Sequence, residues 1–233
     1  MPDSLADLLP WRQPTTESPL MGVTMLLVED SRFACEAIRL MCLRSGARLR
    51  RADCLQSAKR HLQCYRPNLV IIDLGLPDGS GLDLIATLAR QVPRVSAIVA
   101  TSGDADAAQA ALDAGADRFL AKPVESIVVF QQMVLALLPG RPSAVPGSDR
   151  DERSIAPDPA AFRDDLIRAA AMLEPEAESD LDYVARFLAG VAVSAHDTDL
   201  RRAAVALQRD RASGALRLVK GLVRTRLASH AGL

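Results

Sequence analysis

The chain has 233 residues, of which 49% are hydrophobic and 24% charged, and its formal net charge is −1. This length is enough for one or two domains, and the near-neutral charge points to no particular class of partner. No apolar run reaches about 18 residues, which argues against a transmembrane helix. The N-terminus lacks the basic start and apolar core of a secretory signal. The four cysteines form no C-x-x-C pair, so we expect reduced thiols in a cytoplasmic protein rather than a disulfide or metal set.

Residues 1–22 are predicted to form an N-terminal extension. Four prolines interrupt any long element in this segment, which favours an unstructured arm. Its apolar residues allow one alternative, a short helix docked on a neighbouring surface through Leu5, Leu8, Leu9 and Trp11.

Residues 23–138 alternate between strand-like and helix-like patterns. Strands are predicted at 23–28, 47–52, 69–73, 95–100 and 117–121, and helices at 31–44, 54–65, 81–91, 104–114 and 125–138. Three of the strand runs are nearly all apolar, as expected for strands that are buried on both faces. Strict alternation of strand and helix predicts an α/β domain with a doubly wound, five-stranded parallel sheet and right-handed crossovers.

Two further segments follow this domain. Residues 139–159 are rich in proline and glycine and hold too little apolar surface to fold, which predicts a flexible linker. Residues 160–233 are predicted to form a smaller all-α domain, because apolar residues recur at helical spacing without any alternating strand pattern. Pro175 and Gly214 are expected to separate helices, and Asp197 to begin one.

Charge is divided unevenly within the second half of the chain. Residues 149–200 carry a balance of −8, and residues 201–233 a balance of +7. We therefore expect antiparallel helices, or two subunits, to pair through opposite charges.

Polar residues stand at the ends of four predicted strands. Glu29 and Asp30 follow the first strand, Asp73 ends the third, and Thr101 and Lys122 follow the fourth and fifth. The carboxyl ends of parallel strands lie on one edge of a sheet, so these side chains should converge. Each residue alone has an ordinary interpretation, such as a helix cap, an acidic helix start or a surface lysine. The ordered set, with separations of 43, 28 and 21 residues, is far more specific.

This set suits a carboxylate nucleophile beside a divalent cation. A carboxylate attacks phosphorus poorly until a bridging cation removes the charge repulsion. Mg²⁺ is the expected cation, because it is hard, oxygen-binding and satisfied by a few protein carboxylates plus water. Glu29, Asp30 and Asp73 would supply the carboxylates, and Gly75 its backbone carbonyl.

Two other groups suit the phosphoryl oxygens. Lys122 would pair with one of them as a point charge, aimed into the site by a cis peptide bond before Pro123. Thr101 would donate a hydrogen bond to another.

Four segments of the sequence carry a family resemblance. They are Leu27-Val28-Glu29-Asp30-Ser31, Asp73-Leu74-Gly75-Leu76-Pro77-Asp78-Gly79-Ser80-Gly81, Thr101-Ser102-Gly103 and Phe119-Leu120-Ala121-Lys122-Pro123. Through them, residues 23–138 resemble the receiver domain of two-component response regulators, which implies a flavodoxin-like fold. The resemblance covers about half of the chain, and its motifs are highly specific.

The resemblance implies a role for each matching residue. Asp73 would accept a phosphoryl group from a histidine kinase or a phosphotransfer protein, with Mg²⁺ required. Glu29 and Asp30 match the metal-binding acidic pair, and Thr101 and Phe119 match the pair that repacks when phosphate arrives. All site positions are intact, so we expect a phosphorylatable receiver. It would be no enzyme beyond promoting its own phosphorylation and dephosphorylation.

Two glycines flank the expected acceptor. Gly75 and Gly103 leave these positions without side chains, and the space could admit water to a phosphorylated aspartate. Gly75 also argues against a metal-dependent phosphatase of the doubly wound type, which typically needs an aspartate at that position as general acid.

Three outputs are compatible with residues 160–233. A DNA-binding transcription regulator is one alternative, although no strand pair of a winged helix is readable and the arginines of 201–226 resemble a solvated face. A phosphotransfer-like bundle is a second, because Leu218-Val219-Lys220-Gly221 resembles its motif, but Arg217 stands at the histidine position. We favour a helical interaction or dimerisation module that the receiver switches.

Two apolar surfaces are expected to serve association. The helix at 125–138 is apolar on more than one face, and the sheet covers only one of them. The other should meet a second subunit or the C-terminal helices. Within the helical half, self-association or partner binding is expected through Phe187, Leu188 and Val191 or through the helix that begins near Leu200.

Overall fold

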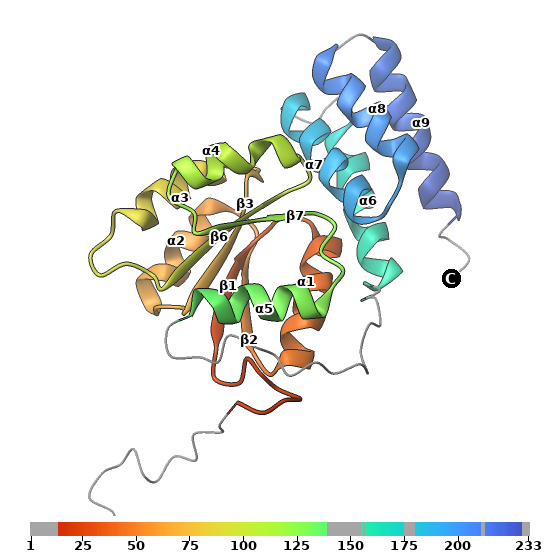
Figure 1. Cartoon of the computed structure of the whole chain (residues 1–233). Helices are drawn as coiled ribbons and strands as arrows, with labels where there is room; N and C mark the ends of the chain where they lie inside the picture. Colours follow the sequence, from red (N-terminus) through yellow and green to blue (C-terminus); the bar gives the residue numbers. More distant parts are fainter. Residues whose placement is uncertain (1–13, 139–154, 156, 175–179, 211–212, 230–233) are drawn as a thin grey trace, which may run out of the picture.

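A computed structural model describes residues 14–138, 155, 157–174, 180–210 and 213–229. Five parallel strands form one sheet in the order β2-β1-β3-β6-β7 (Figure 1). The strands are β1 Thr24–Val28, β2 Arg48–Ala52, β3 Leu69–Asp73, β6 Ala97–Ser102 and β7 Arg118–Ala121. The predicted doubly wound parallel sheet is therefore confirmed, and each predicted strand is present within two residues of its expected start.

Five helices cover the sheet on both faces (Figure 1). They are α1 Arg32–Ser45, α2 Leu55–Cys64, α3 Gly81–Ala89, α4 Ala108–Asp113 and α5 Ile127–Leu137. α1 and α5 contribute to the apolar core on one face, and α2, α3 and α4 to the core on the other. Alternate residues of β1 enter opposite cores, Met25 and Leu27 one and Leu26 and Val28 the other. This two-sided burial explains why the strand run is apolar throughout.

Two local elements differ from the expectation. The helix predicted at 104–114 is a 3-10 turn, Ala105–Ala107, followed by the short α4. The turn after Asp73 contains an antiparallel pair of two-residue strands, β4 Gly75–Leu76 and β5 Gly79–Ser80.

The second half of the chain forms a four-helix bundle over its described residues. Its helices are α6 Pro159–Met172, α7 Leu181–Ser194, α8 Thr198–Arg209 and α9 Ser213–Ser229. α6 and α8 each pack against both α7 and α9, which closes the bundle. None of the helices in the described part of the chain combines the length and apolar character that crossing a bilayer requires.

The bundle core corrects one prediction. Phe187, Leu188 and Val191 are 4%, 0% and 0% exposed, and Leu200 is 0% exposed, because they pack against one another inside the bundle. They do not form the association surface that we expected from their spacing. An amphipathic pattern reveals an apolar face but not whether that face meets the same chain or another.

The bundle packs on the α/β part of the chain. α6 and α7 contact α1, and α7 also contacts β4. α8 and α9 lie on the side of the bundle away from the sheet (Figure 1). The helices of the bundle therefore cover α1 rather than α5, and Val129 of α5 remains 56% exposed.

The predicted extension and linker fall partly outside the described residues. The apolar residues of the expected N-terminal helix lie there. Leu20, by contrast, is described and fully buried, and its amide donates to the Ser45 carbonyl at 2.9 Å. Within the predicted linker, Ile155 is 3% exposed and packs against the core formed by α1 and α5.

The helix boundaries of the bundle follow from its caps. Asp197 begins α8 as predicted, and its carboxylate accepts the Leu200 amide at 3.0 Å. Gly214, which we expected to separate two helices, lies instead in the first turn of α9. Arg226 of α9 donates to Asp197 at 2.7 and 3.2 Å. This pair is one instance of the expected attraction between the acidic and basic parts of the helical half.

We predict that Asp197→Ala destabilises the chain by about 1–2 kcal/mol, because it removes a helix cap and the anionic partner of Arg226 together. The urea midpoint of the helical circular dichroism signal measures the effect. Asp199→Ala is the matched control: Asp199 is 69% exposed and 4.0 Å from Arg226, and its loss should cost less than about 0.5 kcal/mol. Equal losses in the two variants would contradict the role of Asp197.

Candidate functional site

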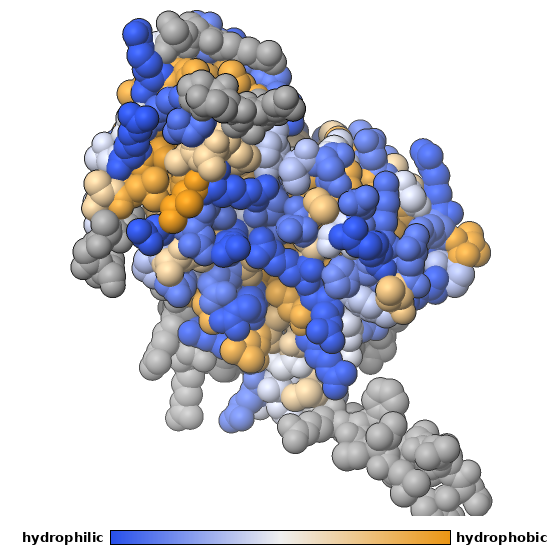
Figure 2. All heavy atoms as spheres, turned by 180° about the vertical axis from the view of Figure 1, so that it is seen from behind, coloured by the Kyte–Doolittle hydropathy of each residue, from blue (hydrophilic) through white to orange (hydrophobic). Residues whose placement is uncertain are grey.

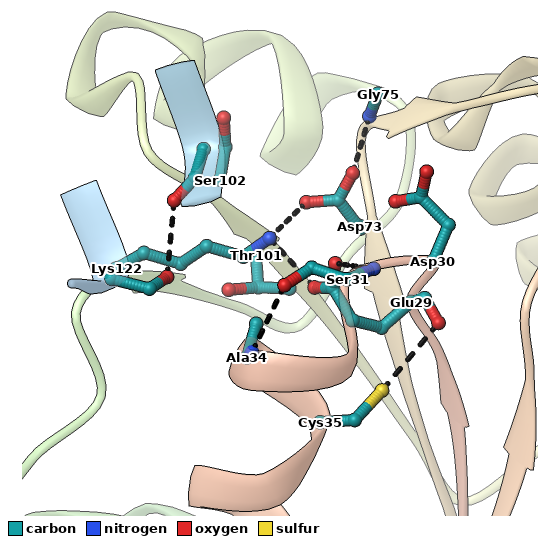
Figure 3. Close-up of polar contacts among 12 residues, drawn as sticks. Glu29, Asp30, Ser31, Ala34, Cys35, Asp73, Gly75, Thr101, Ser102 and Lys122 are labelled. Atoms are coloured by element: carbon teal, nitrogen blue, oxygen red, sulfur yellow. Dashed lines mark hydrogen bonds and ion pairs between the residues drawn. The ribbon is translucent and has the colours of Figure 1, made fainter. Parts of the chain in front are cut away.

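The predicted polar residues meet at the carboxyl edge of the sheet (Figure 3). Glu29 and Asp30 follow β1, Asp73 ends β3, and Lys122 follows β7. Thr101 is the register neighbour of Asp73 on β6. A carboxylate oxygen of each of the three acidic residues lies within 4.8 Å of the others. The convergence predicted from strand order is thus observed.

Lys122 is the cation at the centre of this cluster. Its ammonium nitrogen lies 2.6 Å from Asp73 Oδ1 and 2.6 Å from Glu29 Oε2. The Lys122–Pro123 peptide bond is cis, as expected. Burial by itself lowers the pKa of Lys122, but the carboxylates of Asp73 and Glu29 outweigh it and hold that pKa above its usual value. The lysine therefore stays charged and balances part of the negative charge.

The remaining negative charge is not balanced within the cluster. The pKa of Glu29 is raised to about 8 and that of Asp30 to about 6; burial is the largest cause, the neighbouring Asp73 carboxylate adds to both increases, and Lys122 opposes both. Glu29 Oε2 is paired with Lys122 by charge but accepts no well-directed hydrogen bond. Three crowded carboxylates with one such oxygen fit a hard divalent cation such as Mg²⁺.

Backbone amides orient two of the acidic side chains. The Gly75 amide donates to Asp73 Oδ2 at 2.7 Å, so the turn after β3 holds the carboxylate from the side opposite Lys122. The Ser31 amide donates to Glu29 Oε1 at 3.1 Å, and the Ser31 hydroxyl caps α1 by accepting the Ala34 amide.

The two expected switch residues lie beside the cluster, and no hydrogen bond is described from either side chain to its carboxylates. Thr101 is fully buried, and its hydroxyl donates to the Leu120 carbonyl at 2.8 Å. Phe119 precedes Leu120 on β7 and is half-buried against the core formed by α2, α3 and α4. The structure therefore places Thr101 next to Asp73 but directs its hydroxyl to β7.

Three residues of the bundle reach the site, and sequence reasoning missed all three. The Tyr183 hydroxyl of α7 donates to Asp30 Oδ2. Arg168 of α6 donates to the Asp30 carbonyl at 2.9 Å and lies 3.4 Å from Oδ2. Burial raises the pKa of Tyr183 above its usual value. Asp165 of α6 contacts Ser31 beside Asp30.

One of these residues left a signal in the sequence. Asp165 lies on the buried face of α6 together with Phe162, Leu166 and Ala169. A carboxylate at a core position of an amphipathic helix is unusual unless it has a partner. Tyr183 and Arg168 show no comparable anomaly, because both types are common at half-buried positions.

Gly103 has a packing role that the sequence did not reveal. A side chain there would begin 3.4 Å from Val193 of α7. The space beside the acceptor edge that we expected to be open is therefore occupied by the bundle at this position.

Comparisons with known proteins agree with this geometry. Residues 25–133 match the family described as "Response regulator receiver domain". The KDP operon transcriptional regulatory protein KdpE of Escherichia coli is 39% identical over 100 residues, which are 42% of this chain and 44% of that protein. Response regulator protein PilR of Pseudomonas aeruginosa is 29% identical over 171 residues, 70% of this chain and 38% of that protein.

Solved structures also resemble the chain. The signal receiver domain of a signal transduction histidine kinase from Syntrophus aciditrophicus has a TM-score of 0.46 and 25% sequence identity, covering 58% of this chain and 98% of that chain. This chain spans about half the length of the curated relatives it matches. The family match and the sheet topology coincide on the same segment, and residues 25–133 are a response regulator receiver domain.

Proposed function

We propose that the chain is a phosphorylation-controlled switch in which Asp73 accepts a phosphoryl group. The position of the Asp73 carboxylate carries this proposal. It lies at the end of a buried strand, within 4.8 Å of two other carboxylates and 2.6 Å from Lys122. In the transfer, a carboxylate oxygen of Asp73 forms a bond to phosphorus, the bond from phosphorus to the donor breaks, and the donor keeps the electron pair.

Each neighbouring residue has a part in this transfer. Glu29, Asp30 and Asp73 would hold Mg²⁺, together with the Gly75 carbonyl. When bound, the cation would neutralise the charge between the carboxylate and the phosphoryl oxygens. Lys122 is already beside Asp73 and would pair with a phosphoryl oxygen.

The switch would start at Thr101. Its hydroxyl would leave the Leu120 carbonyl and donate to a phosphoryl oxygen. Loss of that bond frees the segment of β7 that carries Phe119, whose half-buried ring can then repack. The donor would be a histidine kinase or a phosphotransfer protein. The chain itself would promote only its own phosphorylation and dephosphorylation.

The helical bundle would be the output module, acting through self-association or a protein partner. Apolar atoms reach the surface over the bundle in the rear view, at upper left (Figure 2). Among its described residues, Ile167 and Leu218 are large apolar side chains that are 46% and 54% exposed. Val129 of α5 is a third candidate on the receiver. These residues replace the buried Phe187 group as the expected contact surface.

A DNA-binding transcription regulator is the second candidate. The relatives named above include a transcriptional regulatory protein, although the match covers only 42% of this chain. The arginines of α8 and α9 offer the positive charge that phosphates require, and five are exposed: Arg201, Arg202, Arg209, Arg217 and Arg224. Arg217 also occupies the histidine position of a phosphotransfer motif, so α9 could not carry phosphate there.

The first prediction tests the acceptor. With acetyl phosphate and Mg²⁺, the protein should take up one phosphoryl group, and Asp73→Asn should abolish uptake because an amide is not an anionic nucleophile. Intact-protein mass spectrometry measures the label. Asp83→Asn, an exposed change in the first turn of α3, is the control and should be labelled like the unmodified chain. Full labelling of Asp73→Asn would refute the assignment.

The second prediction separates metal binding from phosphate binding. Asp30→Ala should weaken Mg²⁺ binding by about tenfold or more, because it removes one of three carboxylates. Lys122→Ala should leave Mg²⁺ affinity at least as tight, since it removes a competing positive charge, yet impair phosphorylation. Isothermal titration calorimetry gives the affinities. A similar loss of metal affinity in both variants would contradict these roles.

The third prediction separates the two outputs by their response to salt. Binding of DNA through several arginines should fall about a thousandfold or more between 50 and 200 mM salt, whereas an apolar helical interface should change little. We expect the phosphorylated full chain to show self-association or partner binding of the second kind. Sequence-specific, steeply salt-dependent DNA binding would instead establish the transcription regulator.

A further inference from the structure

The helical bundle covers the acceptor edge of the receiver. α7 packs against β4, which follows Asp73, and against Gly103, which follows β6. The side chains of Asp73 and Asp30 are only 10% and 3% exposed. The docked bundle therefore restricts the space through which a phosphoryl-donating protein could approach Asp73.

Two bundle residues hold the metal-site carboxylate of Asp30 directly. Arg168 Nη2 donates to the Tyr183 hydroxyl at 2.6 Å, which leaves that hydroxyl to donate its own hydrogen to Asp30 Oδ2. The Arg168 guanidinium also lies over the Phe187 ring, 4.8 Å from its centroid. The contact with Asp30 is therefore built into the apolar core of the bundle.

A third bundle residue anchors the same interface. Asp165 of α6 accepts hydrogen bonds from the Ser31 hydroxyl, the Arg32 amide and the Phe33 amide at 2.7, 2.9 and 3.0 Å. The first amides of a helix have no partner within it, so Asp165 satisfies donors at the start of α1 that would otherwise face solvent. Asp165 is 1% exposed, and burying a carboxylate to this extent is costly unless hydrogen-bond donors surround it. The contact with α1 supplies those donors.

We propose that this capping contact, made by Asp165, Arg168 and Tyr183, is an intramolecular lock that competes with the divalent cation and the phosphoryl group for the acceptor site. This proposal rests on the proposed function, because the lock acts on the same site at which Asp73 would accept the phosphoryl group. In the locked state Arg168 supplies positive charge at Asp30. In the loaded state the cation does so, and the bundle is released as the output.

The competition follows from charge and geometry. Mg²⁺ needs six oxygen ligands at about 2.0–2.1 Å, and the guanidinium of Arg168 repels a cation at Asp30. A polar cavity of about 730 Å³, lined by Asp30, Arg51, Asp53 and Arg168 among others, adjoins this point. A small cation can therefore approach Asp30 while the bundle is docked. By linkage, docking of the bundle and binding of the cation must weaken each other by the same factor.

The test measures Mg²⁺ binding to the unphosphorylated full chain by calorimetry. Tyr183→Phe should tighten it by about fivefold or more, the lower end of ordinary coupling between sites. Asp165→Ala, which releases the start of α1, should tighten it likewise. Tyr65→Phe is the matched control, because Tyr65 follows α2 and its hydroxyl has no hydrogen-bond partner among the described residues. Arg168→Gln should behave like Tyr183→Phe, and Arg163→Gln, an exposed position on α6, like the unmodified chain.

Hydrogen exchange gives a second readout that reports directly on the contact between Asp165 and the start of α1. The amides of Arg32 and Phe33 should exchange slowly in the unmodified chain and faster once Mg²⁺ and acetyl phosphate are added. Unchanged or weaker Mg²⁺ binding by Tyr183→Phe and Asp165→Ala, in chains that still label at Asp73, would overturn the lock alone. Absence of labelling at Asp73 in every variant would overturn the proposed function, and the lock with it.

Discussion

Three carboxylates and one lysine ammonium group lie close together at the carboxyl end of the sheet, so the cluster carries more negative than positive charge. The contacts that surround the cluster compensate for this excess. Lys122 is placed between Asp73 and Glu29 and balances much of their charge. The ion pairs of Lys122 are with Asp73 and Glu29 and not with Asp30 among the described residues. Burial raises the pKa of Asp30 and that of Glu29. Buried negative charge of this kind is costly unless a cation or a hydrogen-bond donor satisfies it.

The bundle supplies those missing donors. Tyr183 and Arg168 satisfy Asp30, and Asp165 satisfies the start of α1 next to it. The same bundle residues take part in their own core, since Tyr183 and Phe187 are buried there and Arg168 stacks on Phe187. A change in the charge at Asp30 would therefore act directly on the packing of α6 and α7. This direct connection distinguishes the chain from one in which a flexible linker alone joins a receiver to its output.

Coupling through a shared residue needs no path across the domain. In the proposed lock, either the bundle or a cation would satisfy Asp30, and each would disfavour the other because the Arg168 guanidinium and the cation repel each other. The proposed route through Thr101 and Phe119 would be separate: it would run from Asp73 to β7, whereas Asp30 follows β1. Under these proposals the receiver would have two places at which the acceptor site could alter a neighbouring surface.

Much of the receiver could be predicted from its sequence. Asp73 and Thr101 are register neighbours because parallel strands with apolar cores on both faces permit little freedom of register, and the polar residue that ends each strand must then lie on one edge. Glu29, Asp30 and Lys122 follow by the same reasoning. The helical character predicted for residues 160–233 is confirmed for α6 to α9, since apolar spacing and caps such as Asp197 are local signals.

Tertiary structure decided where the bundle lies and what its faces meet. Asp30 and Tyr183 are 153 positions apart in the chain, and nothing local to either residue identifies the other. Phe187, Leu188 and Val191 show the spacing of an apolar face, but only packing determined that this face is the interior of the bundle. Docking depends on the summed shape and charge of α1, α6 and α7. The combined shape and charge of three helices depend on residues that are far apart in the chain. Helix caps, strand periodicity and turn residues depend on a few neighbouring positions and can therefore be read from the sequence.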